Sequence, residues 1–123
     1  MKTFSFLAAF AATTLLATAA HAGACSPEEE GEAGKLAATA TRAAVSKVVS
    51  VTGKQMVNIE SCDVRAGNFD ITYKYNFIGA DGLYWVSARA KLSSSGAGDV
   101  KILKTSPSIA AAEAKAGVKL AAN

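Results

Sequence analysis

The sequence predicts one small α+β domain: an N-terminal helix packed on an antiparallel meander of about four strands, followed by a short C-terminal helix. Three observations lead to this prediction. Residues 68–78 alternate strictly between apolar and polar side chains, two further strand patterns flank them, and an alanine-rich stretch with a helix start precedes them. Because the aromatic face of a strand must be covered by another layer, we expect the first helix to lie on it.

The first 22 residues are typical of a cleaved secretory signal peptide. Met1-Lys2 is positively charged, residues 4–20 are apolar apart from Ser and Thr, and Ala20-His21-Ala22 fits an A-x-A cleavage site. A membrane anchor is the alternative, but this stretch is shorter than the roughly 20 strongly apolar residues of a spanning helix. We therefore expect residues 23–123 to be one exported domain, periplasmic or secreted, without a membrane span.

Two cysteines follow the predicted cleavage site, Cys25 and Cys62. An exported chain meets an oxidising compartment, where an even number of cysteines favours pairing, so we expect a Cys25–Cys62 disulfide. The alternative is a lipid anchor on Cys25, because small residues precede it. The position three before Cys25 is Ala22, whereas lipid-attachment signals usually have Leu there.

The formal charge is low. The whole chain carries +3, and removal of Lys2 with the signal leaves +2. A balance this mild, without a basic stripe interleaved with aromatic residues, predicts no nucleic-acid partner.

The helix should begin at Ser26-Pro27-Glu28-Glu29, where Ser is the N-cap, Pro occupies the first turn and Glu completes a capping box. Small apolar residues then recur at helical spacing from Ala33 to Val51, and Gly53 provides a stop. The acidic residues at 28–32 lack the alternating ligand loop of a calcium site, so we interpret them as compensating the helix dipole.

Residues 55–64 predict the next strand, but two sets of apolar residues fall on its opposite faces: Val57 and Ile59 on one, and Met56, Cys62 and Val64 on the other. A disulfide to the helix start requires Cys62 on the helix-covered face. Either Val57 and Ile59 therefore lie on the far face, or a β-bulge resets the alternation.

Segment lengths test this pairing. A helix from Cys25 to Gly53 would be about 42 Å long, whereas the strand from Gly53 to Cys62 covers about 30 Å. We therefore expect the chain before Gly34 to bend or fold back so that the cysteines meet.

The remaining elements follow from turn residues and alternation. Leu83 to Leu92 predicts a third strand, Asp99 to Thr105 a short fourth strand, and Ser106-Pro107-Ser108 opens an alanine-rich helix over Ile109 to Ala122. This element order resembles the cystatin-like arrangement of a helix wrapped by a sheet. The resemblance is one of element order, and no family motif is matched.

Catalytic chemistry is poorly represented. The single histidine, His21, leaves with the signal, so the mature chain has no imidazole for acid–base catalysis or for a metal site. The carboxylates Glu60, Asp63 and Asp70 are scattered over strands and a turn, with no pattern that brings them together. We expect a protein that is not an enzyme and that uses no cofactor.

The strongest functional signal lies on the sheet face away from the helix. Alternation places Ile78, Leu83 and Trp85 there, with the cations Lys74, Arg89 and Lys91 around them, and Val57, Ile59 and Leu103 are further candidates. An apolar patch that contains Trp and is rimmed by charge has the composition of a recognition surface. The alternative is that the C-terminal tail folds over this face as a second small core.

Two functions fit these residues. The first is an exported interaction module, an inhibitor or accessory protein that binds a protein or peptide through the outer sheet face or an edge strand. The second is a carrier that holds a small apolar ligand between helix and sheet, where Ala88 and Ala90 leave room.

Overall fold

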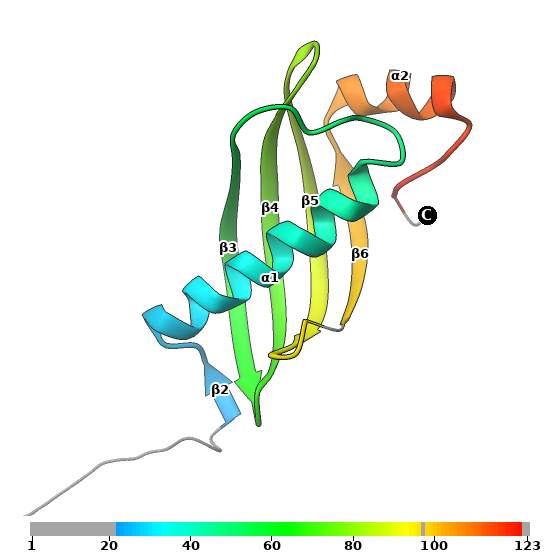
Figure 1. Ribbon diagram of the computed structural model, residues 1–123. Coiled ribbons are helices and arrows are strands. Elements are labelled where there is room, and N and C mark those ends of the chain that lie inside the picture. The colour runs from blue at the N-terminus through cyan, green and yellow to red at the C-terminus, as the bar shows by residue number, and fades with distance from the viewer. Residues whose placement is uncertain (1–21, 97, 122–123) are drawn as a thin grey trace, which may run out of the picture.

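The computed structural model describes residues 22–96 and 98–121, so residues 1–21 of the predicted signal lie outside the described part. The elements in chain order are β2 (Ala22–Ala24), α1 (Pro27–Val45), β3 (Gln55–Arg65), β4 (Asn68–Gly79), β5 (Gly82–Ser93), β6 (Gly98–Thr105) and α2 (Pro107–Ala116). The strands form one antiparallel sheet in the order β2-β3-β4-β5-β6, and α1 crosses one face diagonally (Figure 1). The predicted α+β architecture is confirmed, with the short strand β2 in addition.

The start of α1 is the predicted capping box. The backbone N–H of Glu29 donates to Ser26 Oγ at 3.2 Å, and the backbone N–H of Ser26 donates to Glu29 Oε1 at 2.8 Å. The predicted extension of the helix to Val51 is wrong. The helix ends at Val45, where the Ser46 hydroxyl donates to the carbonyl of Arg42 at 2.6 Å.

Packing of the following segment explains this early end. Val49 and Val51 turn inward and are 8% and 9% exposed, and both belong to the core. The backbone N–H groups of Val48 and Val49 donate to the carbonyl of Val45, and the chain continues as a turn at residues 46–48 and a bend at Val49. The valines therefore close the end of the core instead of continuing the helix.

A β-bulge resolves the conflicting pattern of β3. The pairing of β3 with β4 shifts between Ile59 and Ser61, which leaves Glu60 as the extra residue. Val57 and Ile59 then lie opposite Tyr75 and Tyr73, on the face covered by α1. Their possible place on the far face is thereby excluded.

The same bulge moves Met56, which was expected to share a face with Cys62. Met56 lies opposite Asn76 and is 59% exposed, on the face away from α1. A single extra residue changes the facing of every side chain before it.

The core lies between α1 and the sheet, as predicted. The inward side chains of β4 and β5 are all buried: Phe69, Ile71, Tyr73, Tyr75 and Phe77, then Tyr84, Val86, Ala88, Ala90 and Leu92. From α1, Ala33, Ala37, Thr41 and Val45 are each fully buried against them. Small residues on the helix let its axis approach the ring-bearing surface of β4.

The predicted disulfide is present. Cys25 and Cys62 are bonded with a Cα–Cα distance of 5.5 Å, and the backbone N–H of Cys25 donates to the carbonyl of Cys62 at 3.0 Å. The expected change of direction before Gly34 lies between β2 and α1, and α1 itself runs without interruption from Pro27. Pairing of β2 with β3 and the diagonal path of α1 bring the cysteines together (Figure 1).

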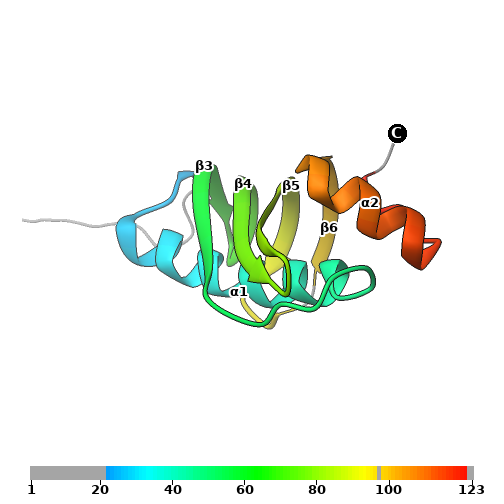
Figure 2. The ribbon, with the colours of Figure 1, turned by 90° about the horizontal axis from the view of Figure 1, so that it is seen from above.

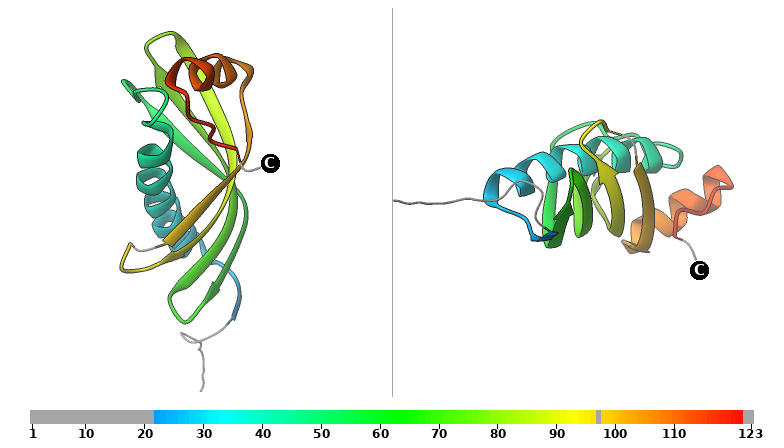
Figure 3. Two further views of the ribbon diagram at one scale, coloured as in Figure 1. Left: turned by 90° about the vertical axis from the view of Figure 1, so that its right-hand side faces the viewer. Right: turned by 90° about the horizontal axis from the view of Figure 1, so that it is seen from below.

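Helix α2 begins at Pro107 and ends at Ala116, short of the predicted Ala122, because Gly117 takes a left-handed C-cap with φ of 71°. Ile109 is fully buried in the core, and Ala121 forms a parallel bridge with Ile102 of β6. Figures 2 and 3 show α2 beyond the β6 side of the sheet. No described helix covers the face opposite α1, which we call the outer face.

Candidate functional site

The outer face carries the large apolar side chains that the described part of the chain exposes. These are Met56, Ile78, Leu83 and Leu103, which are 59%, 38%, 65% and 40% exposed. Ile78 lies opposite Leu83, and Asn76 lies between Met56 and Trp85 in the next row across the strands. We call Met56, Ile78, Leu83 and Trp85 the apolar patch. It lies at the end of the sheet near the β4–β5 turn.

Leu103 is the extra residue of a second bulge. Pairing of β5 with β6 shifts between Ser87 and Ala88, so that Ser87 lies opposite Lys104 and Ala88 opposite Ile102. Ile102 is buried in the core, whereas Leu103 is not among the residues packed against it. Leu103 therefore lies on the outer side of β6.

Cations border the apolar patch. Lys74 and Lys104 lie on either side of Ser87, and the Nζ of Lys74 is 4.5 Å from the centroid of the Trp85 ring. Trp85 is half-buried, and Lys74 makes a cation–π contact with its ring. In the next row, Arg89 lies between Thr72 and Lys101.

Arg89 is held by an ion pair. Its Nε and Nη2 donate to the two carboxylate oxygens of Asp70 at 3.1 and 3.0 Å. The hydrogen bonds and charge of Arg89 lower the pKa of Asp70, with burial acting in the opposite direction. Both side chains are exposed, so the pair sets the orientation of Arg89 more than it stabilises the fold.

The structure thus gathers four of the five predicted site residues. Ile78, Leu83, Trp85 and Lys74 are neighbours, whereas Arg89 lies two rows further along β5. Sequence reasoning did not assign Met56 or Lys104 to this surface. Both depend on β-bulges, and the only signal was the broken alternation in β3 and β6.

Two carboxylates meet on the outer face, contrary to the expectation of scattered acids. Asp63 lies directly opposite Asp70 in the β3–β4 pair. A carboxylate pair suited to acid–base catalysis raises the pKa of one member, whereas the pKa of Asp70 is lowered by Arg89. We interpret the pair as part of a charged surface.

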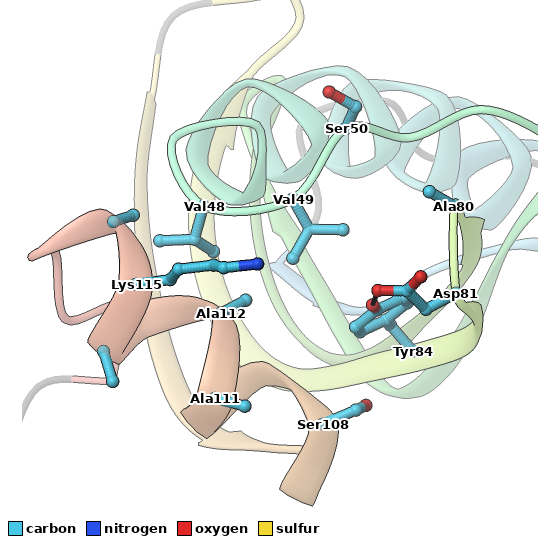
Figure 4. A pocket seen from close by; sticks show the side chains of 12 residues that line it. Val48, Val49, Ser50, Ala80, Asp81, Tyr84, Ser108, Ala111, Ala112 and Lys115 are labelled. Atoms are coloured by element: carbon cyan, nitrogen blue, oxygen red, sulfur yellow. Dashed lines mark hydrogen bonds between the residues drawn. The ribbon is translucent and has the colours of Figure 1, made fainter.

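A second feature is a hollow of about 770 Å³ between the segment after α1, the β4–β5 turn and α2 (Figure 4). Val48, Val49 and several alanines of α2 line it. Asp81 and Tyr84 form one side, with the Tyr84 hydroxyl 3.5 Å from Asp81 Oδ2. Burial, followed by the charge and hydrogen bond of Asp81, raises the pKa of Tyr84.

In the part of the chain that the structure describes, no three His, Cys, Asp or Glu side chains gather closely enough to hold a metal ion. Among the same residues, no helix has the length and apolar composition needed to cross a membrane. Comparison of the chain with protein families, curated proteins and solved structures found no match.

Proposed function

We propose that this protein is an exported interaction module, an inhibitor or accessory protein that binds a protein or peptide partner through its outer face. The observation that carries the proposal is that Met56, Ile78, Leu83 and Leu103 are exposed on one face, beside Trp85. Contiguous exposed apolar surface containing Trp and rimmed by charge is typical of a binding site.

The apolar patch would supply most of the binding energy, and the cations beside it would orient the partner. Leu83 is the most exposed of its residues, and Trp85 presents a ring held in place by Lys74. Lys74 and Lys104 would meet acidic groups of the partner around the apolar contact. The antiparallel sheet and the disulfide hold this surface ready, so docking as a rigid body costs little ordering entropy.

Residues 1–22 would direct export, and the chain would act in the periplasm or outside the cell. The disulfide supports an oxidising compartment. It also speaks against the lipid-anchor alternative, because the Cys25 sulfur is bonded to Cys62 and is not available for acylation.

The carrier alternative has less support. Tyr73, Tyr75 and Phe77 are at most 1% exposed, and they fill the layer between α1 and the sheet where the ligand would lie. We propose no nucleic-acid binding, because Asp63, Asp70 and Asp99 share one row of the outer face with Lys91 and interrupt its cations. We propose no catalysis, because Arg89 lowers the pKa of Asp70 in the carboxylate pair of this face.

Site-specific photo-crosslinking tests the proposal. A benzophenone amino acid replaces Leu83 in one variant and Lys47, exposed on the opposite side of the molecule, in a matched control. Both are expressed in the exporting cell and irradiated. We expect position 83, and not position 47, to trap a partner protein.

Affinity measurement with the purified partner completes the test. Leu83→Ser and Trp85→Ala should each weaken binding about tenfold or more, as central interface residues do, whereas Lys47→Ser should leave it unchanged. Circular dichroism verifies that each variant is folded. Equal trapping from both positions, or equal affinity of all variants, would overturn the proposal.

A further inference from the structure

The hollow beside α2 is separate from the outer face. Tyr84 points to the α1 side of the sheet, whereas its neighbours Leu83 and Trp85 point to the outer face. The hollow is therefore a second surface, on the opposite side of the sheet from the apolar patch.

Its size and walls suit a small apolar molecule. A volume of about 770 Å³ lies within the range of small-molecule sites, roughly 300 to 1,000 Å³. Apolar residues make up much of the lining: Val48 and Val49 on one side, and Ala111 and Ala112 from α2 on the other. The ring of Tyr84 forms part of the floor and stacks on Phe77, with centroids 5.4 Å apart.

The charge inside the hollow selects the ligand. Lys115 extends from α2 toward Val49, so that its ammonium lies within the hollow (Figure 4). Among the described residues, Lys115 makes no ion pair, with Asp81 or with any other acid. Asp81, on the far wall, already accepts from the Tyr84 hydroxyl. Asp81 makes no ion pair either, but Lys115 is the charged group of the hollow that makes neither a hydrogen bond nor an ion pair with another described residue.

From this arrangement we propose that the hollow binds a small amphiphilic anion, an apolar chain or ring that ends in a carboxylate. The carboxylate pairs with Lys115, and the apolar part lies against Val48, Val49 and the α2 alanines. Asp81 acts against a second negative charge at the other end, which favours a ligand with a single anionic end.

Nuclear magnetic resonance titration tests the site on the disulfide-bonded mature chain. The probes are decanoate and decylammonium, which share an apolar chain and differ in the sign of the head group, each below its micelle concentration. Decanoate should shift the backbone resonances of Val49, Tyr84 and Ala112. Decylammonium should bind severalfold more weakly.

Charge variants test the separate roles of Lys115 and Asp81 in decanoate binding. Lys115→Gln should weaken decanoate binding about threefold to fivefold, and Lys115→Arg should retain it. Asp81→Asn should leave decanoate binding equal or slightly stronger. Lys101→Gln, on the outer side of β6, is the matched control and should change nothing.

Ala111→Phe fills the hollow from an exposed position on α2 and should abolish the shifts without unfolding the chain. The proposal fails if decanoate shifts only outer-face residues such as Leu83. It also fails if Lys115→Gln binds as tightly as wild type, or if decylammonium is the preferred probe. None of these results bears on crosslinking from position 83.

Discussion

The hydroxyls of Thr41 and Tyr73 form a buried hydrogen bond between α1 and β4. Both residues are fully buried, and burial raises the pKa of Tyr73 while the bond to Thr41 acts the other way. Thr41→Val removes one partner and leaves a buried hydroxyl unpaired, so it should lower the free energy of unfolding by about 1–3 kcal/mol. Urea denaturation followed by circular dichroism measures this loss.

A double-mutant cycle shows whether the pairing itself matters. Tyr73→Phe should cost a similar amount, and the double variant should cost clearly less than the sum, since it leaves no unpaired hydroxyl. Thr39→Val is the control on the exposed side of α1 and should change stability by less than about 0.5 kcal/mol. Strict additivity of the two core variants would show that the bond is energetically unimportant.

The Asp70–Arg89 pair predicts a small dependence of stability on pH. Arg89 lowers the pKa of Asp70 in the folded state, so the contribution of the pair is fully present above the unfolded carboxyl pKa of about 4. It is lost as the pH falls through the lower folded pKa. Asp70→Asn should therefore have a slightly lower urea midpoint than wild type at pH 7, and this difference should vanish near pH 2.

The difference in urea midpoint between wild type and Asp70→Asn also contains the interactions of Asp70 with two further charged residues. Asp63 lies opposite Asp70 and repels it, whereas Lys91, opposite on the other side, attracts it. Because the pKa of Asp70 is lowered overall, attraction prevails. A higher midpoint for Asp70→Asn than for wild type at pH 7 would contradict this sign.

Among the elements, α1 contains a glycine without a structural requirement. A Cβ built on Gly31 meets no atom within 4 Å, and Gly31 lies inside the helix. Gly31→Ala should raise the free energy of unfolding by about 0.5–1 kcal/mol, because alanine loses less backbone entropy in a helix. Thermal and urea unfolding measure the gain.

Gly79 at the end of β4 is the opposite case and serves as the comparison. A Cβ there would lie 2.7 Å from Cε1 of Tyr84 and 2.9 Å from Cγ1 of Val49. Gly79→Ala should therefore destabilise the fold by about 1–3 kcal/mol through overpacking. Equal changes in the free energy of unfolding for Gly31→Ala and Gly79→Ala would contradict the close packing of Val49 and Tyr84 against Gly79.

Alternation predicted β4 and β5 well, because a pattern with period two needs no knowledge of neighbours. It did not define the facing of β3, because the alternation is regular before and after the bulge but changes face at it. The bulge falls at Glu60-Ser61, where two adjacent polar residues give no apolar signal of the change. The end of α1 was also missed. Val48 and Val51 continue the helical spacing, whereas the structure turns this segment out of the helix and packs Val49 beside Gly79 at the end of β4.

For the whole molecule, the candidate sites differ in how much the sequence reveals. Ile78, Leu83 and Trp85 follow from the facing of β4 and β5, so the outer face could be predicted. The hollow could not, because Lys115 and Asp81 come from segments whose relative position depends on where α2 packs. Strand β2 was missed because its three residues, Ala-Gly-Ala, carry no alternating pattern and begin at Ala22, the last residue of the cleavage motif.

At the scale of the whole molecule, the Cys25–Cys62 disulfide ties the start of α1 to β3. It joins residues 37 apart, and the loop it closes contains all of α1. Loop-closure entropy gives a stabilisation of about 3–4 kcal/mol, a large share of the total for a domain of this size. The variant Cys25→Ala/Cys62→Ala should therefore lower the free energy of unfolding by about that amount in urea.

The reduced protein is the matched comparison, since it keeps both side chains and loses only the bond. It should unfold at nearly the same urea concentration as the double alanine variant. Because β2 is anchored beside β3 through Cys25, amide exchange of Val64 and Phe69 should accelerate before that of Tyr73 at the centre of β4. If reduction left both the midpoint and this exchange order unchanged, α1 would be held on the sheet by its apolar contacts alone.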